Sequence, residues 1–543
     1  MKKHGLSVFN FSFCFLVLLL SGFAACSSTK PAIKDIPVLD YTDEDVVNNE
    51  IERINSLLET EPVGALWRSV LLGREDVKKR CIEILEQKID FSIEEKNYFD
   101  AKKYYKSLKT IGWESSKYSD EKIESICSSD IPGLSKVNKK PPKTVSDCME
   151  ATVTIWVDRG LKVQNGAGYM DIVIGSGFFI DDRGYIVTNH HVIESMVDPK
   201  YEGYSRLYIK LLEDQDTKIP AKVVGYDPFL DLALLKTEIE PKFVLDLGSS
   251  SDLHIGDRVS AIGTPIGLEG TLTSGIISST DRRLLSIGKV FQVDAAVNSG
   301  NSGGPLIDEK LKVQAVVFAG MLQYQGLNFA IPVEYLKQEL NSLYCNEEVI
   351  HPWIAAYGHT KRQGKKKTGL EIQYVLPGGS AAVSGFKCGD VIVEVDGKKV
   401  TSLEDFQYLL MAYEYDTLLT CKYIDESATL REKYLYLQVR PKDPNVVAYK
   451  TDFLKDAFVP MFGMRLVNSS TMSKNSYTIR EVIKGTTADE LNFSENDSIS
   501  VREVKLNKEN EYIVAQILAK RRKKGFLDVT LTIATPYDNQ YFF

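Results

Sequence analysis

The sequence predicts a multidomain chain in which a helical N-terminal part precedes a long all-β region. Three observations lead to this fold class. The chain has 543 residues, which is enough for three to four domains of about 150 residues each. Apolar residues recur with a helical period between residues 43 and 126. Residues 151–331 instead carry many short β-type runs separated by glycine and asparagine, which favours a pair of barrels or a sandwich.

Composition and charge exclude some classes of function. Hydrophobic residues make up 43% of the chain and charged residues 26%, which is typical of globular domains with several cores. The net charge of −8 argues against a nucleic-acid-binding protein, because the field of the protein would repel phosphate. Two short basic runs, residues 361–367 and 520–524, are interpreted as solvated loops. The alternative is a patch that touches anionic lipid or substrate.

The first 25 residues have the layout of a secretory signal peptide that ends at a cysteine. Lys2 and Lys3 precede an apolar run at residues 8–20, which is short for a membrane span. Small residues directly before Cys26 resemble a bacterial lipoprotein cleavage box, although Phe23 departs from its aliphatic pattern. We therefore expect Cys26 to be acylated and to anchor the chain to a membrane. Cleavage without lipidation and an uncleaved anchor are the alternatives.

The segments between this signal and the β-region are predicted as a tether, a helical domain and a linker. Residues 26–42 are polar and contain prolines, and residues 128–147 contain adjacent prolines with lysines and serines. Residues 43–127 form the helical domain, and the stretch 94–112 resembles one half of a tetratricopeptide-type pair. Because no second copy follows at a fixed period, no repeat array is predicted. The role of this domain stays open between a spacer, an oligomerisation module and a docking site.

The cysteine pattern gives no support for a metal site. The chain has eight cysteines but no C-x-x-C or C-x-H spacing. Export would permit disulfides, and Cys127 and Cys148 flank one linker. Scattered buried thiols are the prediction, and neither a metal nor a cofactor is expected.

A serine in the glycine-rich stretch VDAAVNSGNSGGPL, residues 293–306, is the most chemically specific feature. Glycines on both sides of Ser302 allow a bent backbone that exposes the hydroxyl and turns neighbouring N–H groups outward. Acyl transfer needs both at one place, as a nucleophile and an oxyanion hole. A surface serine on a glycine-rich turn would have the same sequence pattern. The interpretation of Ser302 as a nucleophile therefore requires a base and an acid elsewhere in the chain.

A base and an acid precede this serine in the chain. His190 and His191 lie in TNHHV, residues 188–192, directly after a predicted strand. Asp231 begins the apolar run DLALL, residues 231–235, where a carboxylate is costly unless it is paired, and an imidazole N–H is a natural partner. The order His, Asp, Ser is that of chymotrypsin-like enzymes.

These motifs, together with GLNFAIP at residues 326–332, resemble the HtrA (DegP-type) family of trypsin-fold serine proteases. The resemblance implies a protease domain at residues 148–345, built from two six-stranded β-barrels with the triad between them. A histidine immediately before the valine is the catalytic one in the family pattern, which selects His191. The predicted triad is therefore His191, Asp231 and Ser302.

The triad chemistry and the fold assign further residues. The backbone N–H groups of Gly300, Ser302 and Asn301 are expected to bind the oxyanion. Ala296, six residues before the nucleophile, is expected at the floor of the P1 pocket, which predicts cleavage after small or aliphatic residues. Residues 318–326 are expected to form another pocket wall or to pack as a lid.

Two further segments resemble PDZ domains of the kind attached to HtrA proteases. Residues 351–445 contain GSAA at 379–382, GDVI at 389–392 and an Asp-Gly turn at 396–397. The run HPWIAAYG, residues 351–358, stands where the family's carboxylate-binding loop begins, but it lacks a GLGF-like string.

Residues 446–543 are interpreted as a second, more divergent PDZ copy, with residues 462–464 as its candidate binding loop. The expected fold class is thus an N-terminal α-helical domain, an all-β chymotrypsin-like double β-barrel, and two α+β PDZ-like domains. PDZ modules bind C-terminal peptides by adding them to a sheet edge. Assembly surfaces or structural caps are the alternative.

The resemblance implies an exported, ATP-independent serine endopeptidase of protein quality control. Its expected substrates are unfolded or damaged envelope proteins, and its expected place is the membrane surface facing the periplasm. Family members form trimers, so a homotrimer is expected. A peptide-sensing chaperone or scaffold, and a regulatory protease with one specific target, are the alternatives.

Overall fold

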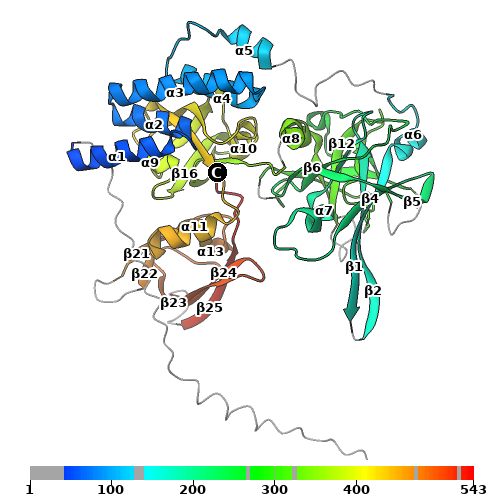
Figure 1. The fold of residues 1–543 in the computed structure, drawn as a ribbon. Helices are drawn as coiled ribbons and strands as arrows, with labels where there is room; N and C mark the ends of the chain where they lie inside the picture. Colours follow the sequence, from blue (N-terminus) through cyan, green and yellow to red (C-terminus); the bar gives the residue numbers. More distant parts are fainter. Residues whose placement is uncertain are drawn as a thin grey trace, which may run out of the picture. The chain divides into compact units, whose positions relative to one another are not determined.

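A computed structural model describes residues 42–127, 140–164, 166–264, 270–285, 287–298, 300–320, 327–345, 347–469, 475–521 and 527–543 (Figure 1). The predicted signal peptide, Cys26 and nearly all of the predicted tether lie outside these residues. So do most of the predicted linker at 128–147 and residues 321–326 of the predicted pocket wall. In the described part of the chain, no helix combines the length and the hydropathy that crossing a bilayer requires.

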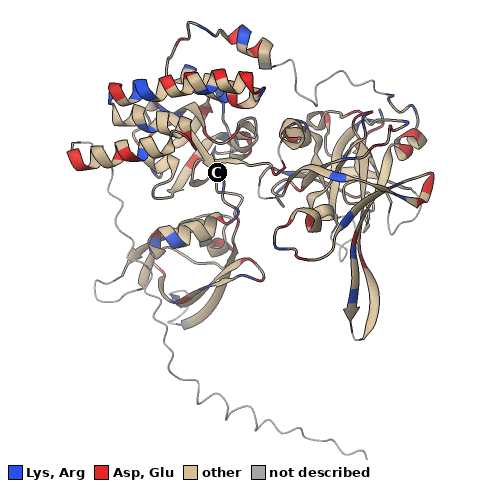
Figure 2. Cartoon of the chain, viewed as in Figure 1, with Lys and Arg blue, Asp and Glu red and all other residues tan. Residues whose placement is uncertain are grey.

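The N-terminal part is helical, as predicted. Ile54, Trp67, Leu85 and Leu108 are buried in its core. Acidic and basic side chains are interspersed along α3 and α4 (Figure 2). The helices are α1 (Glu44–Leu57), α2 (Pro62–Leu72), α3 (Glu75–Glu94), α4 (Tyr98–Thr110) and α5 (Asp120–Cys127).

The first β-unit is an antiparallel sheet in the order β5-β4-β1-β2-β3-β7-β6. Six strands were expected and seven are found, because the strand after β4 is divided at Ala221, directly after Pro220, which has no N–H to donate. The two edges of the sheet are therefore consecutive in the chain. The elements are α6 (Val145–Glu150), β1 (Thr152–Gln164), β2 (Ala167–Phe179), β3 (Tyr185–Thr188), α7 (His190–Val197), β4 (Arg206–Leu211), β5 (Asp214–Pro220), β6 (Lys222–Asp227) and β7 (Leu232–Lys236).

The second β-unit is a closed six-stranded barrel in the order β10-β13-β12-β11-β8-β9. A buried cluster that includes Phe178, Leu232, Ile262 and Val316 joins it to the first sheet, and Leu336 of α8 packs on this cluster. The elements are η1 (Ser250–Asp252), β8 (Arg258–Gly263), β9 (Thr271–Arg282), β10 (Val290–Val293), β11 (Pro305–Ile307), β12 (Val313–Gly320), β13 (Asn328–Pro332) and α8 (Val333–Cys345).

The third β-unit, residues 352–439, is a sheet in the order β14-β20-β19-β17-β16-β15, with β18 paired to β17. Helix α10 lies against β15 and β16, and we call this unit the first PDZ module. Its elements are β14 (Pro352–Trp353), β15 (Ala356–Gln363), β16 (Lys366–Val375), α9 (Ser380–Val383), β17 (Val391–Val395), β18 (Lys398–Lys399), α10 (Leu403–Leu410), β19 (Thr417–Ile424) and β20 (Leu430–Val439).

The fourth β-unit, residues 444–536, has the sheet order β21-β22-β23-β24-β25, and we call it the second PDZ module. Phe458 and Phe462 of α12 are buried in its core. Its elements are α11 (Pro444–Thr451), α12 (Leu454–Phe462), β21 (Met464–Asn468), β22 (Ser476–Val482), α13 (Thr487–Glu490), β23 (Ser498–Asn507), β24 (Tyr512–Arg521) and β25 (Leu527–Pro536).

The N-terminal helices share a core with the first PDZ module. The rings of Trp67 and Tyr436 stack with centroids 4.8 Å apart. At the start of α2 the N–H of Gly64 donates to the carboxylate of Asp416 at 2.9 Å. A carboxylate at this position is favourable because the first N–H groups of a helix have no partner within it.

Candidate active site

The structure brings His191 and Asp231 into direct contact. Nδ1 of His191 lies 2.7 Å from Oδ2 of Asp231, and the backbone N–H of His191 donates to Oδ1 of Asp231 at 2.8 Å. His191 sits in the first turn of α7, where a helix leaves N–H groups unsatisfied. The carboxylate of Asp231 therefore accepts from an N–H group in the first turn of α7 and also orients the imidazole of His191.

Asp231 is held in an uncommon backbone conformation by Asn189. Its φ is +55°, in the left-handed region that few residues other than glycine adopt. The side-chain amide of Asn189 donates to the backbone carbonyl of Asp231 at 2.8 Å. Asn189 is fully buried and precedes α7. This contact ties the segment that carries the acid to the segment that carries the base.

The glycines after Ser302 allow that residue to approach the first sheet. Gly303 has a φ of +86°, and a Cβ there would lie 2.2 Å from the carbonyl oxygen of Ser176. The backbone N–H of Ser176 donates to the carbonyl of Ser302 at 2.7 Å. The loop before β11 is thus fastened to β2, and the predicted nucleophile stands between the two β-units.

The hydroxyl of Ser302 is engaged by a backbone carbonyl of the second barrel. It donates to the carbonyl of Phe318 in β12 at 3.3 Å. Among the described residues, the hydroxyl of Ser302 has a hydrogen bond to Phe318 and has no hydrogen bond to His191. The structure therefore joins two of the three predicted triad residues by hydrogen bonds, and the hydroxyl of the third is bonded to Phe318.

The conformation of the loop before Ser302 determines which backbone N–H groups can donate to an oxyanion. The hydroxyl of Ser176 donates to the carbonyl of Gly300 at 2.6 Å. The carbonyl and the next N–H of a planar trans peptide point in opposite directions, and the N–H of Asn301 donates to the carbonyl of Asn298 at 3.0 Å. In this structure the N–H of Asn301 is therefore bonded within its own loop. Gly300 and Ser302 remain the candidate donors.

The electrostatics of the two histidines differ. Burial opposes a charge on His191, but the hydrogen bond and the charge of Asp231 outweigh it and raise the pKa of His191 above its usual value. Burial lowers the pKa of His190, whose ring stacks on Tyr226 with centroids 5.2 Å apart. Only His191 therefore has the partner that a general base requires.

The remaining predicted position, Ala296, lies exposed in the segment between β10 and β11. The hydroxyl of Thr273 donates to the carbonyl of Ala296 at 2.8 Å and fixes the backbone there.

No group of three or more His, Cys, Asp or Glu side chains arranged to hold a metal ion occurs within the described ranges. The cysteines at 81, 148, 345, 388 and 421 are free thiols.

Several supporting residues were not identified from the sequence. Besides Asn189 and Ser176, they include Thr264, whose N–H donates to the hydroxyl of Ser176 at 3.0 Å. They also include Asp294, whose carboxylate accepts from the N–H of Ile276 at 2.6 Å. Asn189, Ser176 and Asp294 each bond through a side chain to the backbone of another segment, and Thr264 bonds through its backbone to the side chain of Ser176. Of these residues, only Asn189 could have been suspected from the sequence, because it directly precedes the histidine pair.

A second buried cluster lies at the base of the loop that carries Asp231. Nε2 of His351 is 2.8 Å from Oδ2 of Asp227, and both side chains are almost fully buried. The other oxygen of Asp227 accepts from the N–H of Phe229 at 2.8 Å. Burial, reinforced by the charge of Asp227 and opposed by His351, raises the pKa of Glu339 in α8 to about 8. Because Asp227 also accepts from the N–H of Leu230 at 3.1 Å, this cluster anchors the loop.

Comparison with protein-family models finds four matched segments. A trypsin-like peptidase domain matches residues 175–316, and a PDZ domain matches residues 371–417. The TP0546 family PDZ domain matches residues 445–537. A domain of unknown function (DUF8517) matches residues 45–128. The predicted fold class, with helices, a trypsin-like double-barrel domain and C-terminal PDZ domains, is confirmed.

Similar proteins include three named "Probable periplasmic serine endoprotease DegP-like". That of Chlamydia trachomatis is 33% identical over 286 residues, which are 50% of this chain and 56% of the relative. That of Marinomonas sp. is 32% identical over 287 residues, 51% of this chain and 59% of the relative. That of Bartonella henselae is 40% identical over 247 residues, 43% of this chain and 47% of the relative. The chain thus spans about half the length of these relatives.

Proposed function

We propose that this chain, an HtrA-type serine protease with C-terminal PDZ domains, is an exported endopeptidase that hydrolyses peptide bonds of unfolded or damaged envelope proteins. The observation that carries the proposal is the double contact between His191 and Asp231. The loop of Ser302 passes close by, since a Cβ on Gly303 would lie 3.0 Å from the backbone nitrogen of Asn189. The names of its relatives support a location in the periplasm. No ATP-dependent step is required by this chemistry.

The reaction follows from these side chains. The hydroxyl of Ser302 gives up its hydrogen bond to Phe318 and rotates toward Nε2 of His191. His191 then takes the hydroxyl proton as the oxygen of Ser302 attacks the substrate carbonyl. Asp231 stabilises the imidazolium that forms. The N–H groups of Gly300 and Ser302 receive the oxyanion. His191 then returns the proton to the leaving amine, and water hydrolyses the acyl-enzyme.

The test compares the wild-type chain with Ser302→Ala and with a control, Ser251→Ala, at an exposed serine. We expect wild type and the control to digest unfolded casein and to react with a fluorophosphonate probe, and Ser302→Ala to do neither. Absence of labelling in wild type would contradict the proposal. It would favour the second candidate, a peptide-sensing chaperone or scaffold, which the contact between Ser302 and Phe318 supports because the hydroxyl there is not directed at the base.

Substrate selection is proposed from Ala296. A small apolar side chain at the pocket floor leaves no carboxylate for Arg or Lys, so peptides with Val or Ala at P1 should be cleaved faster than Arg peptides. Digestion of one natural partner while casein stays intact would indicate a regulatory protease with a single target.

Anchoring and assembly are proposed as well. We expect Cys26 to carry the lipid that holds the chain on the envelope membrane, and the intact mass of the mature N-terminus tests this directly. An unmodified Cys26 would contradict it. Sedimentation of the detergent-solubilised chain tests the homotrimer.

A further inference from the structure

The edge of the first PDZ sheet is paired with the last residues of the same chain. Strand β15 is the edge strand, and the segment from Tyr541 to Phe543 runs antiparallel beside it. The N–H of Ala356 donates to the main-chain oxygen of Phe543 at 3.0 Å, and the N–H of Phe543 donates back to Ala356 at 2.8 Å. The N–H of Gly358 donates to the carbonyl of Tyr541 at 3.1 Å. Strand addition of this kind is how PDZ modules hold extended peptides.

The side chains of this segment alternate between two apolar surroundings, as those of a strand do. Phe543 is 2% exposed and enters the core of the first PDZ module, with its ring 5.2 Å from that of Phe406 in α10. The ring of Tyr541 stacks on His359 with centroids 4.0 Å apart. Phe542 faces the other way and is buried beside Tyr374 and Val459, in a cluster that both PDZ modules share.

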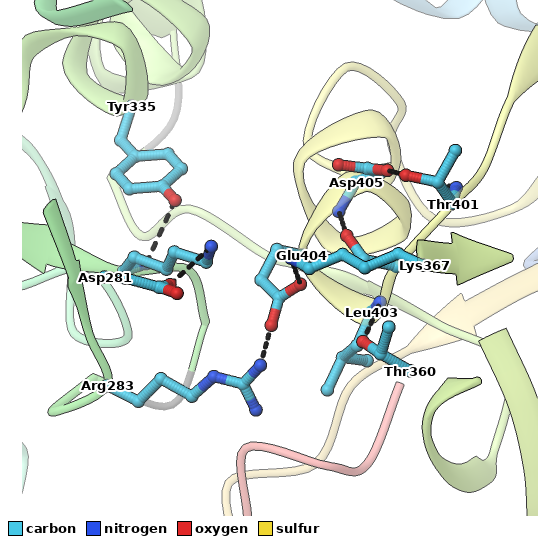
Figure 3. Close-up of polar contacts among 11 residues, drawn as sticks. Asp281, Arg283, Tyr335, Thr360, Lys367, Thr401, Leu403, Glu404 and Asp405 are labelled. Carbon is cyan, nitrogen blue, oxygen red and sulfur yellow. Dashed lines mark hydrogen bonds and ion pairs between the residues drawn. The ribbon is translucent and has the colours of Figure 1, made fainter. Parts of the chain in front are cut away.

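Helix α10 closes the other side of the groove. The side-chain amide of Gln407 donates to the carbonyl of Gln540 at 2.8 Å. The N–H of Leu403 donates to the hydroxyl of Thr360 at 3.0 Å, which holds the start of α10 against β15 (Figure 3). Glu404, on the same helix, is paired with Lys367 and with Arg283 (Figure 3).

We infer that residues 540–543 are an intramolecular ligand of the peptide groove between β15 and α10. The groove selects an extended segment with aromatic side chains two residues apart, the spacing of Tyr541 and Phe543. A peptide from another molecule binds only when this segment leaves. Because a tethered segment acts at an effective concentration on the order of millimolar, a free peptide competes poorly with it.

The test measures binding of a fluorescein-labelled peptide with the sequence of residues 536–543, PYDNQYFF, by fluorescence anisotropy. The full chain is used with Ser302→Ala, so that the peptide is not cleaved. We expect a variant that ends at Asn539 to bind the peptide at least about tenfold more tightly than the full-length Ser302→Ala chain. A peptide with Ala in place of Tyr541 and Phe543 serves as the control and should not bind.

A second variant covers the case in which the shortened chain does not fold. Phe543→Ala keeps the chain length and the strand pairing but removes the ring that fills the core, so it too should bind the peptide more tightly than its parent. Adding Phe406→Ala should abolish that gain. Equal affinity in the parent and in folded variants would overturn the inference. So would a dimeric parent that becomes monomeric in the shortened chain, because the segment would then occupy a neighbouring copy.

Discussion

The side-chain amide of Asn189 donates to the backbone carbonyl of Asp231 at 2.8 Å, and Asp231 occupies the left-handed region with a φ of +55°. A residue other than glycine in that region carries strain of about 1–3 kcal/mol, which the surrounding structure has to offset. Asn189 provides one such contact, and it comes from the residue next to the histidine pair. The acid and the base are thereby positioned by the same short segment.

Replacing Asn189 with alanine should weaken the triad without removing any of its members. Loss of a buried hydrogen bond of about 1–3 kcal/mol at the Asp231 carbonyl corresponds to a fall of roughly tenfold to hundredfold in kcat. Steady-state kinetics on a Val-P1 peptide measure the effect. Asn189→Asp, which lacks the amide donor, should behave like Asn189→Ala. A kcat equal to that of wild type in both variants would show that Asn189 does not position the acid.

Asp231→Asn should lower kcat by about four orders of magnitude, because an amide neither holds the required tautomer nor stabilises the imidazolium. It should also lower the pKa of His191, whose elevation in the native chain comes from Asp231. In wild type the acidic limb of kcat/KM should therefore lie above the usual histidine value of 6.5. NMR titration of the imidazole in a Ser302→Ala background, with and without Asp231→Asn, measures the shift. An unchanged titration would contradict the pairing.

Glu339 should make the protein less stable as pH rises through neutrality. Burial raises its pKa to about 8 from 4.5, so between these values the folded chain holds a proton that the unfolded chain has released, and stability falls with rising pH. The raised pKa of the buried His351 acts in the same direction, since its contribution is complete below 6.5 and is lost as pH rises through the folded value.

Glu339→Gln should therefore change the free energy of unfolding little at pH 5 and increase it at pH 8 by about 2–4 kcal/mol. Urea unfolding at both pH values measures this. Glu309→Gln, at an exposed position, is the control and should change neither. An equal effect of Glu339→Gln at both pH values would contradict the assignment.

Gly64→Ala should detach the N-terminal helices from the first PDZ module. A Cβ at Gly64 would lie 2.6 Å from the hydroxyl oxygen of Tyr436, so the ring that stacks on Trp67 would have to move. Trp67→Ala removes the same contact from the other side and should destabilise the chain by about 3–5 kcal/mol. Limited proteolysis between residues 127 and 140 reports the detachment. Gly168→Ala, where a Cβ meets no atom within 4 Å, is the control, and cleavage no faster than in it would refute the effect.

Much of this protein could be predicted from its sequence, because the deciding signals are local. The helical period before residue 127 and the short β-runs after residue 151 predicted the order of domain types. The motifs around His191, Asp231 and Ser302 marked candidate side chains, and the glycines beside Ser302 indicated a bent backbone there. Such features depend on residue type and spacing, which a sequence records directly.

The tertiary structure decided which backbone groups face one another. Ser176 acts on the carbonyl of Gly300, 124 residues away in the chain, and Asn189 acts on the carbonyl of Asp231, 42 residues away. The N–H of Asn301 is used within its own loop, and the hydroxyl of Ser302 is turned to Phe318. Phe543, which reads as one more apolar residue of the second PDZ module, fills the groove of the first. These relationships arise only when distant segments pack, because hydrogen bonds and van der Waals contacts depend on position in space and leave no periodic trace in the chain.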